Sequence, residues 1–277
     1  MSDSLTTTLA NSLVSVERFV VYSDYLEREV QIDAYLPKSV QKPEQMSLLL
    51  VNDGQDLVTM KFEDILEHLY KTEELKPIMC LGIHCGEERK REYGVSYSSD
   101  FKQRGDKAGL YSKFILDELL PYVRKHFNMP HFKEKCYAGF SLGGLSAMDI
   151  AWNHSSEFSK VGVFSGSFWW RRKGYDDGYD DELDRLMHLQ IRKGKMSPWL
   201  QFYIQTGELD EKADRNQNGI IDSIDDALDL VVELKAKGYT EPQHIQYVQL
   251  ADGKHDVPTW AKAFPDFLKW GWGTKKI

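Results

Sequence analysis

The sequence Gly-Phe-Ser-Leu-Gly at residues 139–143 decides how the rest of the chain is interpreted, because it reads G-x-S-x-G at a change of secondary structure. A short apolar segment, residues 135–139, precedes it, and a helical pattern follows over residues 142–153. A serine on a tight strand-to-helix turn requires small residues two positions before and after it, since bulky side chains would clash there. The pattern therefore predicts a nucleophile elbow that presents Ser141, with the amide of Leu142 available to stabilise an oxyanion.

Short apolar segments alternate with helical patterns along most of the chain. Strands are expected over residues 16–22, 29–35, 47–51, 78–84, 136–139, 160–164, 200–205 and 245–250, and helices over residues 62–72, 111–127, 142–153, 223–237 and 260–270, the last interrupted near Pro265. Such alternation predicts the α/β class, with a mostly parallel sheet, helices on both of its faces and an antiparallel hairpin at its start.

The organisation of the chain gives no reason to divide it. No internal repeat or linker separates residues 1–277, so a single domain is expected. Residues 171–197 are rich in charge and glycine, and we expect them to form a cap or excursion on this domain.

Composition limits the class of partner and the compartment. The formal net charge is −8, which argues against nucleic-acid binding. Residues 1–13 are polar and lack the basic start and apolar stretch of a signal peptide, and no apolar run reaches membrane-spanning length. We therefore expect a cytoplasmic protein with no membrane partner and with its three cysteines as free thiols. The sequence does not indicate the oligomeric state.

A serine nucleophile needs a histidine base and an acid, which follow it in the order Ser, Asp or Glu, His when the serine lies on such an elbow. His255 follows the expected strand 245–250, in a loop from which a base can reach back to the serine. The acid is expected after the preceding strand, at Asp210, with Glu208 as the alternative. The second oxyanion donor is expected after an earlier strand, at the backbone amide of Gln55.

With these residues in place, the chain resembles the esterase family of α/β-hydrolases that includes enterochelin (ferric-siderophore) esterases, feruloyl esterases, S-formylglutathione hydrolases and mycolyltransferases. The segments that carry the resemblance cover nearly the whole chain: Asp53-Gly54-Gln55, residues 139–144, Phe164-Ser165-Gly166-Ser167, Thr206-Gly207 leading to Asp210, and Gly253-Lys254-His255-Asp256. Among the branches, the chain looks most like the bacterial enterochelin-esterase-like group, and residues 89–93 look like the corresponding segment of its members.

The resemblance implies an α/β-hydrolase fold with Ser141 as nucleophile, His255 as base and an acid near Asp210. It also implies oxyanion donors at the amides of Gln55 and Leu142. Candidates for the substrate pocket are Phe140, Trp169, Trp170 and Arg89. Aromatic side chains at the rim would hold an aromatic or sugar-like group, and the arginine would receive an anionic one. Packing in the core and a solvated charged surface are the alternatives.

Residues 214–225 have the spacing of a calcium-binding loop. The candidate ligands are Asp214, Asn216, Asn218, Ile220, Asp222 and Asp225, with Gly219 at the turn. Two features depart from the usual pattern: the last ligand is Asp instead of Glu, and a strand leads into the loop. The alternative is a polar turn whose carboxylates complement the dipole of the following helix. A calcium ion here would be structural and would lie just beyond Asp210.

These patterns predict a serine esterase that hydrolyses a carboxylic ester of a small molecule through an acyl-enzyme, with no cofactor required for catalysis. Two alternatives stay open. An acyltransferase would use the same residues but admit an alcohol in place of water. A non-catalytic binding module could carry the same fold, because a fold does not imply a function. The sequence does not name the acyl or alcohol group.

Overall fold

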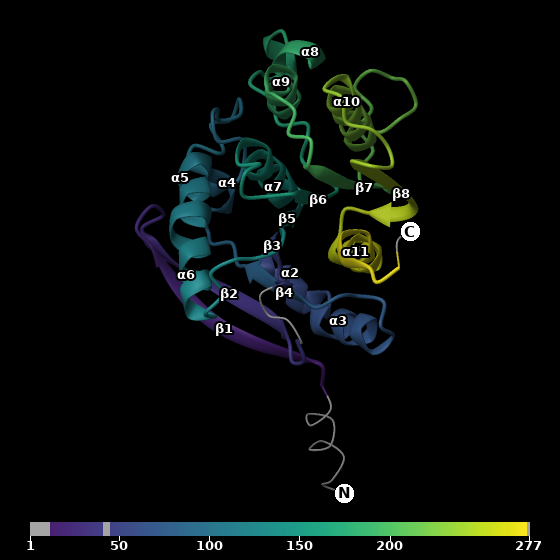
Figure 1. Ribbon diagram of the computed structural model, residues 1–277. Coiled ribbons are helices and arrows are strands. Elements are labelled where there is room, and N and C mark those ends of the chain that lie inside the picture. The colour runs from purple at the N-terminus through teal and green to yellow at the C-terminus, as the bar shows by residue number, and fades with distance from the viewer. Residues whose placement is uncertain (1–11, 41–44, 276–277) are drawn as a thin grey trace, which may run out of the picture.

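The computed structural model describes residues 12–40 and 45–275 of the chain (Figure 1). The expectation for residues 1–13 therefore lies almost entirely outside the described residues. Within them, one sheet contains β1 (Val14–Ser23), β2 (Arg28–Pro37), β3 (Ser47–Asn52), β4 (Ile78–Ile83), β5 (Lys135–Phe140), β6 (Lys160–Phe164), β7 (Gln201–Leu209) and β8 (Ile245–Lys254). Their order across the sheet is β1-β2-β4-β3-β5-β6-β7-β8.

The sheet is mostly parallel, as the sequence predicts. The hairpin β1–β2 is antiparallel, and β2 also pairs antiparallel with β4. The pairings from β4 through β3, β5, β6 and β7 to β8 are all parallel. Parallel neighbours need crossover connections, and these are provided mainly by helices on the two faces of the sheet.

Helices are observed at α2 (Gly54–Thr59), α3 (Phe62–Lys71), α4 (Arg89–Glu92), α5 (Ala108–Lys113), α6 (Leu120–His126), α7 (Leu142–Asn153), α8 (Asp181–Asp184), α9 (Leu186–Lys193), α10 (Asp222–Ala236) and α11 (Val257–Trp272). The helix expected over residues 111–127 is a longer run in which a π-helical segment, Phe114–Leu119, joins α5 to α6. The break expected near Pro265 is wrong, because α11 continues through that residue. The short helices α2 and α4 were not predicted.

The buried side chains form two cores, one on each face of the sheet. In β3, Leu48 and Leu50 face one core and Leu49 and Val51 face the other, as the two-residue period of a strand requires. The first core lies under α5, α6, α7, α9 and α10, and the second under α2, α3 and α11. Strands buried on both faces explain why their sequences read as continuous apolar runs. These observations confirm the predicted α/β-hydrolase fold class.

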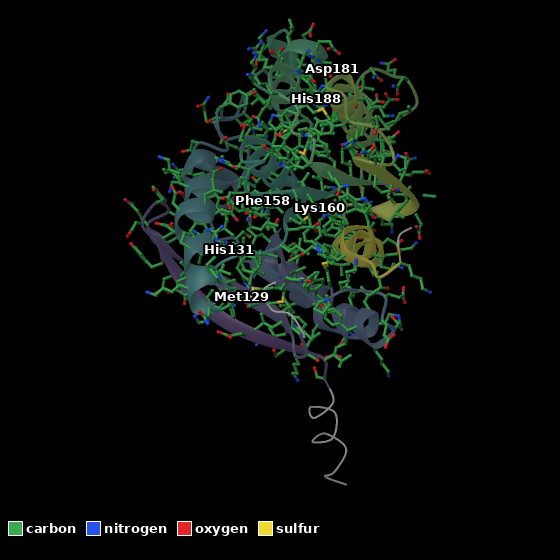
Figure 2. The ribbon with its side chains drawn as sticks, in the orientation of Figure 1. Met129, His131, Phe158, Lys160, Asp181 and His188 are labelled. Carbon is green, nitrogen blue, oxygen red and sulfur yellow. The ribbon has the colours of Figure 1, made fainter. Side chains whose placement is uncertain are left out.

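Residues 171–197 form an excursion between β6 and β7 that contains α8 and α9 (Figure 2). Buried ion pairs join this excursion to α10, since Nη1 of Arg185 lies 2.8 Å from Oδ1 of Asp226. The buried His188 adds a hydrogen bond from its ring to the Asp226 carbonyl oxygen, at 2.9 Å. The excursion is thus packed beside the sheet core. Among the described residues, no helix is long and apolar enough to cross a bilayer.

The carboxyl ends of the parallel strands meet at one edge of the sheet. Asn52 ends β3, Phe140 ends β5 and Phe164 ends β6, while β7 and β8 end at Leu209 and Lys254. In open parallel sheets, ligands bind in the crevice outside this edge. The residues predicted for the site follow these strand ends directly, so the topology brings them to the same edge.

Candidate active site

Ser141 lies between β5 and α7 with φ 53° and ψ −121°, a region that side-chain-bearing residues rarely occupy. The turn is tight. A Cβ on Gly139 would lie 2.4 Å from the carbonyl oxygen of Gly143, and a Cβ on Gly143 would lie 2.6 Å from Oδ2 of Asp53. Gly139 is therefore required by close backbone approach and Gly143 by the side chain of Asp53, as expected for a nucleophile elbow.

His255 reaches the serine from the far end of the sheet. It follows β8 directly, and its Nε2 lies 2.9 Å from Oγ of Ser141. Asp256 then begins α11, since its carboxylate accepts a hydrogen bond from the amide of Thr259 at 3.0 Å. This cap fixes where the strand stops and the helix starts, and so fixes the short segment that carries the imidazole.

The two acid candidates point in different directions. Asp210 is half-buried, and its carboxylate accepts hydrogen bonds from the hydroxyl of Ser165 and the amide of Gly207, each at 3.2 Å. Glu208 is exposed and accepts a hydrogen bond from the side-chain amide of Gln249 at 2.9 Å. Between Asp210 and His255, two described residues, no hydrogen bond is formed in this structure. The geometry leaves Asp210 half-buried beside Ser165 and turns Glu208 toward the surface.

The electrostatics also connect Asp210 to His255. Although His255 is exposed at the surface, the protein around part of its ring desolvates it and lowers its pKa, and the negative charge of Asp210 opposes this shift. Desolvation raises the pKa of Asp210, while the Gly207 amide and the Ser165 hydroxyl lower it. Perturbed pKa values are concentrated at functional sites.

The predicted oxyanion donors lie in the first turns of two helices. Leu142 is the first residue of α7, and Gln55 is the second residue of α2. Backbone amides in a first helical turn have no acceptor within the helix, so they can donate to another group. The loop before α2 turns through Asp53, which has φ 59°. Asn52 connects the two regions, because its side-chain amide donates to the Gly143 carbonyl at 2.8 Å.

Arg89 lies beside this loop and forms a salt bridge with it. Its Nε and Nη2 donate to the two carboxylate oxygens of Asp53, each at 2.7 Å, and its guanidinium lies 5.1 Å from the centre of the Tyr93 ring. The side chain keeps 29% of its surface exposed. Arg89 is therefore both part of the loop and partly accessible.

Two of the aromatic pocket candidates are wrong. Phe140 and Trp170 are fully buried. Phe140 belongs to the core under α11, where it stacks on Trp260 with ring centres 4.9 Å apart. Large apolar rings gain more free energy from burial than from an exposed rim, which explains this placement. Trp169 is only half-buried and carries the guanidinium of Arg104 at 5.0 Å from its ring centre, so it alone of these aromatic residues is accessible.

The predicted calcium loop is closed by its own hydrogen bonds. The side-chain amides of Asn216 and Asn218 each donate to Oδ2 of Asp225 at 2.8 Å. Asp222 instead turns toward Arg215, accepting from its backbone amide at 2.9 Å. Across the described part of the chain, no group of three His, Cys, Asp or Glu side chains is placed to hold a metal ion. In this structure the carboxylates of the loop do not point toward a common centre, and calcium binding stays a prediction.

Sequence reasoning did not assign a role to Ser165, Ser167 or Trp260 individually. Oγ of Ser167 lies 3.4 Å from Oγ of Ser141, and Ser165 contacts Asp210 as described above. The segment 164–167 contributed to the family resemblance, and its position after β6 is the signal that could have identified both serines. Nothing in the sequence context of Trp260 indicates the contacts of its indole nitrogen.

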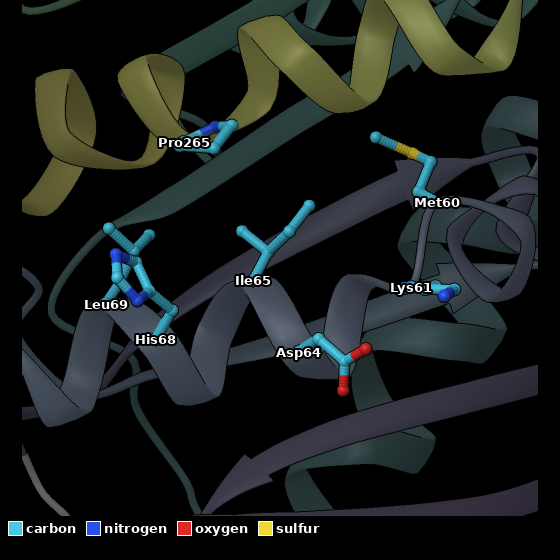
Figure 3. Close-up of a pocket in the computed structure, with 7 residues that line it drawn as sticks. All are labelled: Met60, Lys61, Asp64, Ile65, His68, Leu69 and Pro265. Carbon is cyan, nitrogen blue, oxygen red and sulfur yellow. The ribbon is translucent and has the colours of Figure 1, made fainter.

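A groove elsewhere in the molecule lies between α3 and α11 (Figure 3). It is lined by Met60, Lys61, Asp64, Ile65, His68, Leu69 and Pro265. None of these residues was predicted for the site. The groove lies between helices that cover the second core, whereas the site residues follow the strand ends.

Similar solved structures share the fold. The enterochelin esterase from Shigella flexneri has a TM-score of 0.70 at 19% identity, over 92% of this chain and 57% of its own. A ferulic acid esterase has a TM-score of 0.69 at 17% identity, over 94% of this chain and 98% of its own. The BES protein from Bacillus cereus has a TM-score of 0.66 at 19% identity, over 93% and 96%. This chain thus spans little more than half of the Shigella enzyme.

Sequence comparison gives one curated relative, "Uncharacterized protein YbbA" of Bacillus subtilis (strain 168), which is 23% identical over 231 residues. That alignment covers 82% of this chain and 85% of the relative. Residues 23–270 match the family described as "Putative esterase". This match covers the elbow, the strand ends of the site and nearly all of the helices described above, so the chain belongs to this esterase family.

Proposed function

We propose that the protein is a serine carboxylic-ester hydrolase. The observation that carries the proposal is the 2.9 Å approach of His255 Nε2 to the hydroxyl of Ser141 on a strained elbow. A serine hydroxyl is a weak nucleophile unless an adjacent base accepts its proton. Two residues that lie 114 positions apart in the chain meet at hydrogen-bonding distance, which is the arrangement that this activation requires.

The proposed reaction begins when Ser141 Oγ attacks the ester carbonyl and its proton passes to Nε2 of His255. Asp210 holds the imidazole in the required tautomer and stabilises the imidazolium. The amides of Gln55 and Leu142 donate to the tetrahedral oxyanion. His255 then protonates the leaving alcohol, which departs and leaves an acyl-enzyme. A water activated by His255 attacks the acyl carbonyl, and release of the acid restores the Ser141 hydroxyl.

The substrate we propose is a small ester of the enterochelin-esterase-like type. Support comes from the family match and from neighbours whose names refer to enterochelin and ferulic acid esters. Within this chain, the half-buried Trp169 and the partly exposed Arg89 provide an aromatic surface and a cation near the strand ends. An aromatic acyl group that carries an acidic substituent would use both.

The test is a panel of chromogenic, feruloyl, acetyl-sugar and catecholate-siderophore esters, assayed with wild type and Ser141→Ala. The best substrate should lose activity by roughly 10⁶-fold in the variant, as in comparable triads, while the variant stays folded by circular dichroism. Residual activity within tenfold of wild type, in a preparation free of other esterases, would contradict the proposal. Adding an alcohol acceptor and analysing the products separates hydrolysis from acyl transfer.

A further inference from the structure

A buried chain of hydrogen bonds lies behind the proposed acid. Nε1 of Trp260 donates to Oγ of Ser165 at 3.1 Å, and that hydroxyl donates to Oδ1 of Asp210 at 3.2 Å. Trp260 and Ser165 are both buried. These hydrogen bonds join three elements that are far apart in the sequence: α11, the loop after β6 and the loop after β7.

The donor and acceptor of each of these hydrogen bonds follow from the chemistry of the groups. An indole nitrogen can only donate, so the Ser165 hydroxyl must accept from Trp260. The single O–H of Ser165 is then free to donate a hydrogen bond to the carboxylate of Asp210. Each group thus has one role, and the chain favours one orientation of the Asp210 carboxylate. In keeping with this, the Ser165 hydroxyl lowers the pKa of Asp210 against the effect of burial.

Trp260 also contacts the proposed base. Its ring packs edge-on against the His255 imidazole, with centres 5.5 Å apart and planes at 80°. On its other side it stacks on Phe140, which is buried in the core. Its backbone amide donates to the carbonyl of Asp256, the neighbour of His255, at 3.2 Å. The indole is therefore held by the core while it contacts the histidine.

Ser165 adopts a conformation that the surrounding structure must enforce. Its φ is 46°, in the left-handed region that favours glycine. Its amide donates to the carbonyl of Gln205 on β7 at 2.8 Å, which ties the loop after β6 to the strand that leads to Asp210. Strain of this kind is concentrated at functional sites.

We propose that Ser165 and Trp260 are positioning residues that hold Asp210 and His255 in the arrangement the reaction needs. Neither touches the reacting atoms: Ser165 acts through the acid, and Trp260 acts through both the acid and the base. This inference rests on the roles given to Asp210 and His255 in the proposed function.

The test compares Ser165→Ala and Trp260→Phe with a matched control. Ser165→Ala removes the hydroxyl that links indole to carboxylate. Trp260→Phe keeps an aromatic ring against His255 and removes the N–H donor. Trp272→Phe is the control, because Trp272 is a buried indole of the same helix whose nitrogen has no hydrogen-bond partner among the described residues.

Two readouts separate positioning from general stability. The first is the division between kcat and KM: we expect kcat to fall by about tenfold to a hundredfold in Ser165→Ala, with KM within about twofold of wild type. Trp260→Phe should show a smaller loss of the same kind. The double variant should lose little more than Ser165→Ala, because both substitutions interrupt the same chain.

The second readout is the titration of the His255 imidazole by NMR, assigned by its absence from His255→Asn. Asp210 raises the pKa of His255, so a loosened carboxylate should move the titration midpoint to lower pH. We expect this shift in Ser165→Ala and Trp260→Phe and not in Trp272→Phe. Folded variants at Ser165 and Trp260 that match the control in both kcat and midpoint would overturn the inference.

The titration requires no substrate, so the two hypotheses can fail separately. If wild type hydrolyses no ester but Ser165→Ala shifts the His255 midpoint, the proposed function fails and the positioning role stands. If wild type is an esterase that depends on Ser141, and neither variant changes kcat or the midpoint, the positioning role fails and the proposed function stands.

Discussion

Ser141 has a backbone conformation that it would not adopt alone, and its neighbours hold it there. The amide of Ser141 donates to the carbonyl of Phe164 at 2.8 Å, and the amide of Ser167 donates to the carbonyl of Ser141 at 3.1 Å. The last residue of β6 and the loop after it thus hold the backbone of the elbow in place. This fixation presents the hydroxyl to His255 before any substrate arrives, so little reorganisation is required in the reaction.

The identity of the acid is tested by two conservative substitutions. Asp210→Asn should lower kcat by about 10⁴-fold, because an amide in place of the carboxylate favours the wrong imidazole tautomer. Glu208→Gln should stay within a few-fold of wild type, since Glu208 is exposed and contacts Gln249. Measured kcat values with the best ester decide the question. An inactive Glu208→Gln together with an active Asp210→Asn would exchange the two roles.

The pH dependence follows from the protonation state of the base. His255 accepts a proton only when it is neutral, and its neutral form predominates above its pKa. Desolvation lowers the pKa of His255 from its ordinary value of 6.5. We therefore expect kcat/KM to reach half of its plateau at a pH below 6.5 and to decrease further as the pH falls. A pH–rate profile with its acidic midpoint above 6.5 would contradict this account.

Sequence order indicated which residues to consider for the site, but not the contacts that hold them. Ser141 and His255 follow strands and could be named from their positions. Asp210 and Glu208 are two residues apart near a register irregularity between Gly207 and Leu209, so their directions could not be predicted. The contact of Trp260 with Ser165 joins residues 95 positions apart, and side-chain contacts over such separations are not encoded in a local pattern.

At the level of secondary-structure elements, the junction of β5 and α7 depends on close backbone approach. Gly139→Ala should lower the free energy of unfolding by about 1–3 kcal/mol or more, because its Cβ would lie 2.4 Å from a backbone oxygen that cannot rotate away. Gly271→Ala is the matched control, since Gly271 lies within α11 and a Cβ there would meet no atom of the described residues within 4 Å. That control should gain roughly 0.5–1 kcal/mol. Urea denaturation measures both changes in the free energy of unfolding, provided that the variants and wild type have equal m-values.

The calcium prediction belongs to the loop that leads into α10. We propose that Ca²⁺ binds to the side chains of Asp214, Asn216, Asn218, Asp222 and Asp225 and to the carbonyl of Ile220, once the two asparagines turn their amide oxygens inward. Calcium should then raise the melting temperature of wild type by mass action, and should leave that of Asp225→Ala unchanged. An identical melting temperature of wild type with calcium and with chelator would leave the loop as a polar turn before the helix.

Several elements were predictable from their apolar patterns. The helix 142–153 and the strand 160–164 have the expected bounds. The helix α11 does not break at Pro265, because a buried face that includes Trp260, Phe264 and Phe267 offsets the lost backbone hydrogen bond. The short helix α2 was missed since six residues carry too little periodicity to be recognised.

At the scale of the whole molecule, the sheet gathers the site from five strands. β3, β5, β6, β7 and β8 are parallel neighbours, so the loops that follow them open on the same edge. Alternation of strands and helices predicted such a sheet. The strand order, with β4 placed between β2 and β3, depends on long-range pairing that the sequence alone does not express.

Covalent labelling with a serine-directed reagent tests whether Ser141 is a nucleophile activated by His255. The wild-type protein is incubated with a fluorophosphonate, and its intact mass and tryptic peptides are measured. We expect one phosphonyl group per chain, attached to Ser141, with no labelling of Ser141→Ala and strongly slowed labelling of His255→Asn. An unlabelled wild type, or a label located at Ser165 or Ser167, would contradict it.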